Sequence, residues 1–159
     1  MIGKKPIVII FEGVDKSGKT TLLNMFNKAT NFGYVVLDRF TTSSKVYNTL
    51  FNRDRREYYN EVEQSFLKAF NVLIVYCYCS PGECFSRLAM AKETLPEELH
   101  VIPIVKNEFK IELLKTLDDV DKNPEMNLEV LEIDTEMFSK EYCVDKIQEK
   151  VKEMECEDS

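Results

Sequence analysis

The chain has 159 residues, of which 44% are hydrophobic and 31% charged, and it carries a formal net charge of −7. A chain of this length suits one domain whose core buries about 70% of the unfolded surface, and no apolar run approaches the ~20 residues of a membrane span. Residues 1–6 are basic but lack the apolar core of a signal peptide. We therefore expect a single domain, residues 1–159, in the cytoplasm.

The charge is distributed unevenly along the chain. Residues 1–60 carry ten Lys and Arg against five Asp and Glu, a net charge of +5, whereas residues 61–159 carry eleven against twenty-three, a net charge of −12. A positive first half suits the binding of small polyanions, and the acidic remainder disfavours nucleic acid as a partner. For the second half, a solvated acidic surface is the simpler explanation.

A buried strand followed by a glycine-rich loop opens the chain. Residues 7–11, IVIIF, are apolar without alternation, as in a parallel strand covered on both faces. Residues 13–20 then have the spacing G-x-x-x-x-G-K-T, in which backbone amides bind phosphates, the lysine contacts the outer phosphates and the threonine hydroxyl contacts Mg²⁺. A plain glycine-rich turn is the alternative, but the preceding strand favours a phosphate loop. The candidate nucleotide-binding residues are Gly13, Ser17, Gly18, Lys19, Thr20 and Thr21.

The next helix and strand complete a βαβ unit. Apolar residues at helical spacing follow Thr20, and Gly33 is the expected stop of this helix. Residues 34–37, YVVL, then predict a second short strand, so residues 7–37 form a right-handed βαβ unit.

Asp38 and Arg39 follow the second strand, at the sheet edge where ligands bind in open parallel sheets. Asp38 can hold Mg²⁺ opposite the Thr20 hydroxyl, and Arg39 can contact a phosphate. The alternatives are a turn cap for Asp38 and a surface ion pair for Arg39.

Residues 41–51 are polar and weakly helical and place Tyr47 soon after Arg39. Asp54 and Glu57 have capping-box spacing, which predicts a helix whose buried stripe recurs every four residues. Positive side chains in the first turn of a helix interact unfavourably with the helix dipole, so one explanation is that a substrate phosphate binds these arginines. The favoured alternative is that they form a basic turn exposed to solvent. The stripe consists of Tyr58, Val62, Phe66 and Phe70, and the arginines are Arg53, Arg55 and Arg56.

Residues 71–79 predict a third strand, and its cysteines are expected to be reduced and buried, because C-x-C-x4-C without a nearby histidine is poor zinc spacing. Nucleotide-bound Mg²⁺ is the metal that the sequence implies. The remaining expected elements are a helix at 81–91 capped by Ser80, a lid-like segment at about 90–104 with His100 exposed, a helix at 105–120, an edge strand at 128–134, a last helix capped by Ser139, and a frayed acidic tail at 155–159.

Three segments together resemble the thymidylate kinase family within the P-loop nucleoside monophosphate kinases. Residues 11–21, FEGVDKSGKTT, match the family's F-E-G-x-D-x-x-G-K-[ST]-T start, which is far more specific than a bare phosphate loop. Residues 38–40, DRF, match its D-R-[YF] motif, and residues 80–88, SPGECFSRL, are similar to its D-P-E segment and helix. The likeness covers most of the chain, whose compact form is similar to small phage-encoded thymidylate-kinase-like proteins.

The resemblance implies roles for the motif residues and a homodimer as the assembly. Lys19 would bind the phosphates of ATP, and Thr20 with Asp38 would organise Mg²⁺. Asp15 would contact the sugar hydroxyl of the acceptor, and Arg39 its phosphate.

Lys16 occupies a position where some members carry a catalytic arginine, whose charge a lysine supplies without the bidentate fork. Two features depart from the family. Only 17 residues separate Thr20 from Asp38, which shortens the acceptor pocket, and residues 88–104 hold one lysine and one histidine in place of lid arginines. Either other basic residues take over that role, or transfer is weak; the candidates are Arg53, Arg55, Arg56 and Lys16.

We expect an α/β P-loop fold, a three-layer sandwich with a parallel sheet of order 2-1-3-4. The expected function is ATP- and Mg²⁺-dependent phosphorylation of a deoxynucleoside monophosphate such as dTMP. The alternatives are a kinase for a hydroxyl acceptor, on a nucleoside or a modified base, and a nucleotide-binding regulatory protein without transfer activity. The candidate catalytic residues are Lys19, Lys16, Asp38 and Arg39, and the candidate substrate-binding residues are Asp15, Arg39, Tyr47, Arg53 and Arg56.

Overall fold

Four parallel strands form one sheet in the order β2-β1-β3-β4, which confirms the predicted order. The computed structural model describes residues 4–14, 16–91 and 102–157. The strands are β1 (Ile7–Glu12), β2 (Val35–Asp38), β3 (Asn71–Tyr78) and β4 (Asn127–Asp134).

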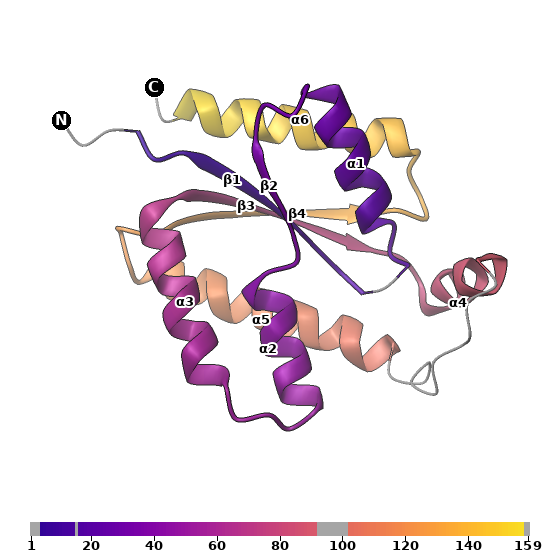
Figure 1. The fold of residues 1–159 in the computed structure, drawn as a ribbon, viewed down its shortest axis with the longest axis horizontal. Coiled ribbons are helices and arrows are strands. Elements are labelled where there is room, and N and C mark those ends of the chain that lie inside the picture. The colour runs from indigo at the N-terminus through magenta and orange to yellow at the C-terminus, as the bar shows by residue number, and fades with distance from the viewer. Residues whose placement is uncertain (1–3, 15, 92–101, 158–159) are drawn as a thin grey trace.

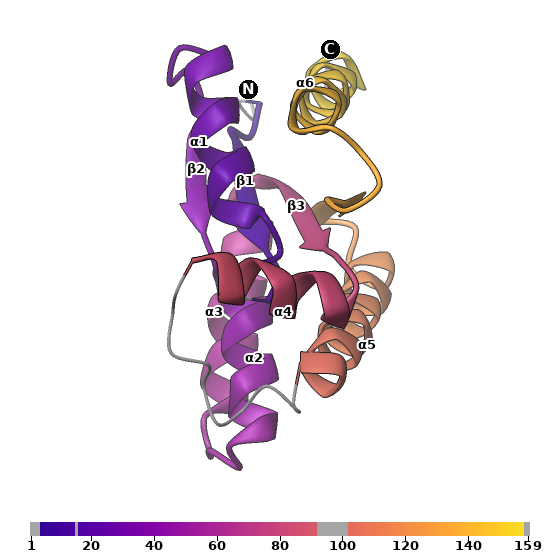
Figure 2. The ribbon, with the colours of Figure 1, turned by 90° about the vertical axis from the view of Figure 1, so that its right-hand side faces the viewer.

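Helices cover both faces of this sheet and give the three layers expected of the fold (Figure 1). Helices α1 and α6 lie on one face, and α2, α3 and α5 lie on the other, while α4 crosses the end of the sheet (Figure 2). No helix in the described part of the chain is long and apolar enough to cross a membrane. The helices are α1 (Lys19–Ala29), α2 (Thr41–Leu50), α3 (Arg56–Ala69), α4 (Pro81–Met90), α5 (Ile102–Asp121) and α6 (Lys140–Glu157).

The two central strands are largely apolar, apart from Glu12 at the end of β1 and Asn71 at the start of β3, because each strand has a helical layer on both sides. Val8 and Ile10 of β1 pack into the core beside α2, α3 and α5, whereas Ile9 and Phe11 pack into the core beside α1 and α6. Side chains alternate between the two faces of a strand, so an unbroken apolar run satisfies both cores. The continuous pattern of residues 7–11 therefore predicted a central strand correctly.

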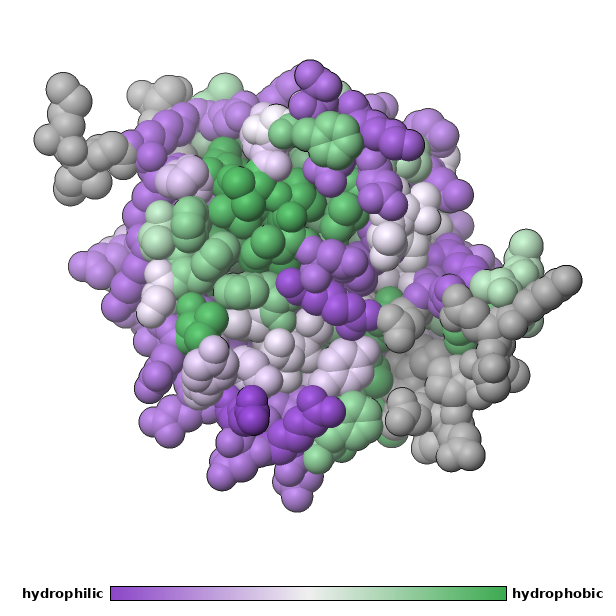
Figure 3. Space-filling view, viewed as in Figure 1, coloured by the Kyte–Doolittle hydropathy of each residue, from purple (hydrophilic) through white to green (hydrophobic). Residues whose placement is uncertain are grey.

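The outer strands have one neighbour each, and β4 is an edge as its alternating sequence predicted. The other edge, β2, exposes Val35, and hydrophobic surface is visible there between the two helical layers (Figure 3). Strand β2 ends the βαβ unit. The segment from Thr20 to Asp38, which leads to this strand, is the one that is shorter than in the thymidylate kinase family pattern.

Three expected helix ends differ in the structure. Helix α1 ends through Asn31 and Phe32, which have positive φ values of 51° and 55°, and not through Gly33. The expected capping box of α3 is also wrong: the helix begins at Arg56 after Arg55, with no side-chain cap, and the Arg55 amide donates to the Asn48 side chain. At the other terminus the helical conformation continues to Glu157, into the tail expected to fray.

The expected buried stripe of α3 is shifted around the helix. Tyr58 is 60% exposed, and the fully buried positions are Glu63 and Leu67, with Phe66 and Phe70 packed partly against the core. Because the charged Glu63 lies at the centre of the buried face, that face points in a different direction around the helix axis from the one that the apolar residues alone predict. Helix α3 therefore meets its neighbours through a polar contact as well as through aromatic packing.

The expected lid falls mainly outside the described residues. Of the segment 90–104, Met90 belongs to α4 and residues 102–104 begin α5, while residues 92–101, including His100, lie outside the description. Helix α5 begins at Ile102, before the predicted start at 105, whereas α4 ends at Met90, within one residue of the predicted end.

Cys77, Cys79 and Cys84 are free and buried, as predicted. Burial raises the pKa of Cys77 and of Cys84 to about 12, so both thiols stay protonated at neutral pH.

A buried ion pair joins α2 to α3 and α5. Lys45 Nζ lies 2.5 Å from one carboxylate oxygen of Glu63, and the hydroxyls of Thr116 and Thr41 donate to the same carboxylate at 3.2 and 2.6 Å. Replacement of Glu63 by Leu removes the carboxylate that the buried Lys45 ammonium contacts, and breaking a buried pair in this way typically costs about 3–5 kcal/mol.

We predict that Glu63→Leu lowers the free energy of unfolding, measured by urea titration, by about that amount, and that adding Lys45→Met recovers most of the loss. Removal of the exposed Lys122–Asp118 pair through Lys122→Gln serves as the matched control and should change stability by less than about 0.5 kcal/mol. Equal stability of Glu63→Leu and the control would contradict the buried network.

Candidate functional site

The loop between β1 and α1 requires glycine at both ends of its motif. Gly13 has φ +147°, and a Cβ atom there would lie 2.3 Å from the carbonyl oxygen of Cys77. Gly18 has φ +89°, and a Cβ atom there would lie 3.2 Å from the Thr135 side chain. A side chain at Gly13 would displace the backbone of β3, so the strand and the loop pack together only with glycine at this position.

Helix α1 begins directly after this loop with its donors uncapped by any side chain. Gly18 is the N-cap residue, no side chain accepts a hydrogen bond at the cap, and the first turn contains no acidic residue. The first amides of a helix have no partner within the helix, and the dipole places positive potential there. This end of α1 is suited to an anion.

Lys19 and Asp38 meet in an ion pair across the site. The Lys19 side chain is only 7% exposed and its ammonium donates to Asp38, whose side chain is 48% exposed. Asp38 can reach Lys19 because β2 pairs directly with β1, with Phe11 opposite Asp38. The structure thus brings together two of the predicted catalytic residues, one from the first turn of α1 and one from the end of β2.

Arg39 lies beside this pair in a strained backbone conformation. Its φ is +68°, and its amide donates to the Phe11 carbonyl at 2.9 Å. Its guanidinium lies 5.9 Å from the Tyr47 ring centre and donates weakly to the Tyr47 hydroxyl at 3.5 Å. Non-glycine residues in the left-handed region are uncommon and concentrate at functional sites.

A row of two aromatic rings with a guanidinium group at each end continues from this point along α2. Tyr47 stacks on Phe51 with centroids 6.0 Å apart, and Arg53 lies 5.2 Å from the Phe51 ring centre. Arg39, Tyr47 and Arg53, which were predicted to bind substrate, therefore share one surface. This row of rings and guanidinium groups can stack on a planar group and attract an anion.

Arg56 does not join that row. Both of its terminal nitrogens donate to the Glu112 carboxylate at 2.8 Å, which links α3 to α5. The predicted contact of Arg56 with substrate stays a prediction, while its contact with Glu112 holds the two helices together. Asp15, the expected contact for the acceptor sugar, lies outside the described residues.

Glu12 is a buried carboxylate at the end of β1 to which sequence reasoning assigned no role. One of its oxygens accepts hydrogen bonds from the Phe40 amide at 2.8 Å and the Ser43 amide at 3.3 Å. Its other oxygen, Oε2, is buried without a hydrogen-bond partner in the described structure, and so is the Ser17 hydroxyl. Burial raises the pKa of Glu12 despite these two amides and the nearby Arg39 charge.

The residues at the site fit a nucleotide-bound Mg²⁺ ion. The described residues contain no cluster of three or more His, Cys, Asp or Glu that could hold a metal alone. Mg²⁺ is commonly bound through one or two protein oxygens together with phosphate and water. Asp38 and the hydroxyl of Thr20, the residue after Lys19, would supply such a pair, and the metal would contribute charge neutralisation at the phosphates.

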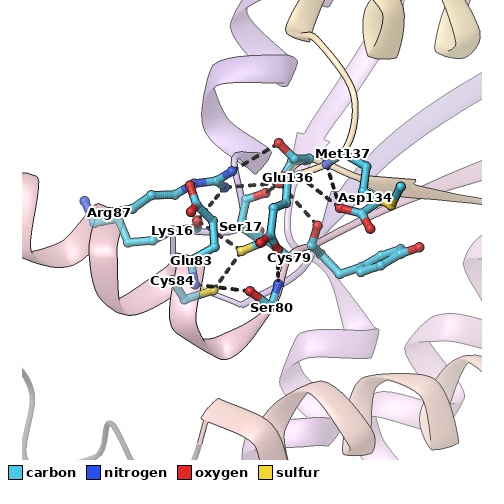
Figure 4. A network of polar contacts seen from close by, with 12 residues as sticks. Lys16, Ser17, Cys79, Ser80, Glu83, Cys84, Arg87, Asp134, Glu136 and Met137 are labelled. Carbon is cyan, nitrogen blue, oxygen red and sulfur yellow. Dashed lines mark hydrogen bonds and ion pairs between the residues drawn. The ribbon is translucent and has the colours of Figure 1, made fainter.

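The outer side of the loop is held by side chains from distant parts of the chain (Figure 4). Arg87 of α4 donates to the Lys16 carbonyl at 3.0 Å, and Thr135, which follows β4, donates through its hydroxyl to the Ser17 carbonyl at 2.5 Å. Sequence reasoning missed both residues. Thr135 could have been found, because it lies at the carboxyl end of a parallel strand, where ligand sites gather.

Comparisons with known proteins agree on the fold. No protein-family model matches the chain, and no curated protein matches it. The structure is similar to the YorR protein of Bacillus subtilis in complex with phosphorylated GDP, with a TM-score of 0.65 and 18% identity over 91% of this chain and 95% of that one.

It is also similar to thymidylate kinase from Candida albicans, with a TM-score of 0.55 and 15% identity over 95% of this chain and 93% of that one. Deoxyadenosine kinase from M. mycoides, with the products dCMP and dCDP bound, gives a TM-score of 0.53 and 14% identity over 92% of this chain and 99% of that one. The chain therefore has the P-loop kinase fold, as the resemblance predicted.

The raised pKa of Glu12 makes stability depend on pH with a definite sign. The folded protein holds this proton at pH values where the unfolded chain, with a pKa near the ordinary 4.5, has released it. The contribution of Glu12 to stability is therefore full below about pH 4.5 and is lost as the pH rises through the raised folded value.

We predict that Glu12→Gln, which keeps an acceptor for the Phe40 amide and cannot ionise, becomes progressively more stable relative to wild type as the pH rises above 4.5. Urea titrations at several pH values measure this difference. A difference that stays flat across these pH values would contradict the raised pKa.

Proposed function

We propose that the protein transfers the terminal phosphoryl group of ATP, with Mg²⁺, to a deoxynucleoside monophosphate. The observation that carries the proposal is the Lys19–Asp38 contact at the mouth of the glycine loop, which joins the triphosphate-binding lysine to a candidate metal-binding carboxylate. The similarity in fold to thymidylate kinase supports this class of reaction.

Phosphoryl transfer brings two anions together, and different residues of the site would bind each of them. The loop amides and Lys19 would bind the β and γ phosphates, because uncapped helix donors and an ammonium group both attract anions. Arg39 would bind the acceptor phosphate opposite them. Transfer of this kind depends mainly on alignment and on neutralising the charge of the migrating group, which these cations provide.

The surface along α2 suits the rest of a nucleotide acceptor. The Tyr47 and Phe51 rings offer a face on which a base can stack, and Arg39 and Arg53 lie at the two ends of this row. An acceptor phosphate on Arg39 would place its sugar and base along the row. We propose dTMP or a related deoxynucleoside monophosphate as the acceptor, and the homodimer suggested by the family resemblance stays a prediction.

Glu12 favours a second candidate, phosphorylation of a nucleoside hydroxyl. A hydroxyl acceptor needs a base to take its proton, whereas a phosphate acceptor is already ionised at neutral pH. Glu12 has a buried oxygen without a hydrogen-bond partner in the described structure and a raised pKa, which are the properties of a general base. One similar structure, a deoxyadenosine kinase, has the nucleoside monophosphate dCMP bound as a product.

We predict that Lys19→Ala weakens ATP binding by roughly 10- to 100-fold, because it removes a charge-assisted hydrogen bond to phosphate. Isothermal titration calorimetry with ATP and Mg²⁺ measures the affinity. Lys28→Ala, at an exposed position in the last turn of the same helix, removes equal charge away from the loop and is the matched control. Equal ATP affinity of Lys19→Ala and wild type would contradict nucleotide binding at this loop.

We predict that the loss of rate in Glu12→Gln distinguishes a monophosphate acceptor from a hydroxyl acceptor. Wild type and variant are incubated with ATP, Mg²⁺ and each deoxynucleoside or deoxynucleoside monophosphate, and products are separated by ion-exchange chromatography. With a monophosphate acceptor, the transfer rate of the variant should fall by less than about tenfold relative to wild type. With a hydroxyl acceptor, it should fall by about 100-fold or more. ATP binding with no product from any acceptor would identify a nucleotide-binding protein without transfer activity.

A further inference from the structure

Two backbone carbonyls of the phosphate loop are fixed by side chains that belong to neither the loop nor its helix. The Lys16 carbonyl accepts from Arg87 at 3.0 Å, and the Ser17 carbonyl accepts from Thr135 at 2.5 Å. The two donors also contact each other, since a second hydrogen bond of Arg87 reaches the Thr135 hydroxyl at 3.1 Å. One connected set of hydrogen bonds therefore spans α4, the loop and the segment after β4 (Figure 4).

The orientation of a carbonyl sets the orientation of the next amide. The described chain contains no cis peptide bond, and in a trans peptide the C=O and N–H groups point in opposite directions. When Thr135 holds the Ser17 carbonyl on the outer side of the loop, the amide of Gly18 points to the inner side. That amide precedes Lys19, on the side where the helix start and the lysine face a phosphate.

The same contacts stabilise a strained turn of the loop. Lys16 has φ +63°, a conformation that costs a non-glycine residue free energy, and its carbonyl is the one that Arg87 holds. The turn is closed on its other side by the Ser17 amide, which donates to the Val14 carbonyl at 3.2 Å. Without Arg87, the Lys16 carbonyl would lose its nitrogen donor and keep the weak contact from the Cys79 thiol at 3.9 Å.

The guanidinium of Arg87 is well placed for this task because each of its three nitrogens donates a hydrogen bond. Its Nε donates to Glu83 at 2.9 Å, and its second terminal nitrogen donates to the Thr135 carbonyl at 3.1 Å. Glu83 lies one turn earlier on α4 and holds the arginine in position. A planar fork with fixed donors can join acceptors on three residues at once, whereas a lysine ammonium on a flexible stem does so poorly.

Thr135 contacts the loop through its carbon atoms as well as its hydroxyl. A Cβ atom at Gly18 would lie 3.2 Å from the Thr135 Cβ and Cγ2 atoms, so the loop packs closely on this residue. Its amide donates to the Tyr78 carbonyl at 2.9 Å, which fixes Thr135 to the end of β3. The residue thus connects the sheet edge to the loop by packing and by hydrogen bonding.

We propose that Arg87 and Thr135 are positioning residues that hold the phosphate loop in its nucleotide-binding shape before the nucleotide arrives. The inference rests on the proposed binding of ATP by this loop and adds residues that do not touch the nucleotide. Preorganised amides bind phosphate without a further ordering cost, so the two side chains act on the affinity for ATP. They leave the acceptor and the transfer step unaffected.

Two substitutions at Thr135 separate the hydroxyl from the shape of the side chain. Thr135→Val keeps the branched shape and removes the donor, and it should raise both the dissociation constant and the KM for ATP by about tenfold. Thr135→Ser keeps the donor and should stay within about threefold of wild type. For Thr135→Val, kcat per folded molecule and the KM for the acceptor should change by less than about twofold.

Arg87→Lys gives an independent test of the same connected set. It should also weaken ATP binding by about tenfold, and the double variant Arg87→Lys with Thr135→Val should weaken it by less than the product of the single effects, because the two residues share one hydrogen bond. A role in stability alone would lower the melting temperature and the folded fraction and leave the KM for ATP unchanged. That outcome would overturn the proposal.

ATP affinity is measured by calorimetry, and KM and kcat with the acceptor that wild type uses. Wild type that binds ATP, with Thr135→Val and Arg87→Lys binding it equally well, would overturn the positioning role and leave the proposed function intact. Wild type that binds no ATP would overturn both. Weakened binding by Thr135→Val together with rescue by Thr135→Ser supports the proposal.

Discussion

The contact between Lys19 and Asp38 is the interaction on which the site depends. It exists because the chain passes directly from the βαβ unit into the Asp38–Arg39 turn, with β2 next to β1. The carboxylate that ends one strand therefore lies at the loop that follows the other. Asp38 is the partner of Lys19 in the structure, so under the proposed function Lys19 would exchange this carboxylate for a phosphate when the nucleotide binds.

Two buried carboxylates, Glu12 and Glu63, hold α2 beside this pair. Glu12 accepts the first amides of α2, and Glu63 gathers Lys45 and two hydroxyls between α2, α3 and α5. Buried ionic groups contribute little net stability, since desolvation offsets their attraction. Their effect here is to fix α2, which carries Tyr47, at a defined position beside the loop.

Local patterns in the sequence predicted the elements that depend on local chemistry. The apolar run before the glycine loop, the Ser80 cap of α4 and the buried face of α6 are all confirmed, because each is set by residues close together in the chain. Pattern reasoning failed at the end of α1, where Asn31 and Phe32 take the left-handed conformations expected of glycine. It failed again on α3, where a buried Glu63 takes the place of an apolar residue.

The residues of the site that sequence reasoning missed share a different property. The partners of Thr135 and Arg87 in the loop are more than 70 residues away in the chain, and Glu12 binds an amide 28 residues further on. No periodicity or short motif records such contacts, so only the folded arrangement reveals them. The motif residues, by contrast, were found because the phosphate loop is a local structure.

The affinity of Asp38→Asn for ATP, measured with and without Mg²⁺, tests the central claim most directly. If Asp38 competes for Lys19 in the free protein and binds the metal in the complex, the variant should bind ATP more tightly than wild type without Mg²⁺ and more weakly with it. Unchanged affinity under both conditions would contradict the account.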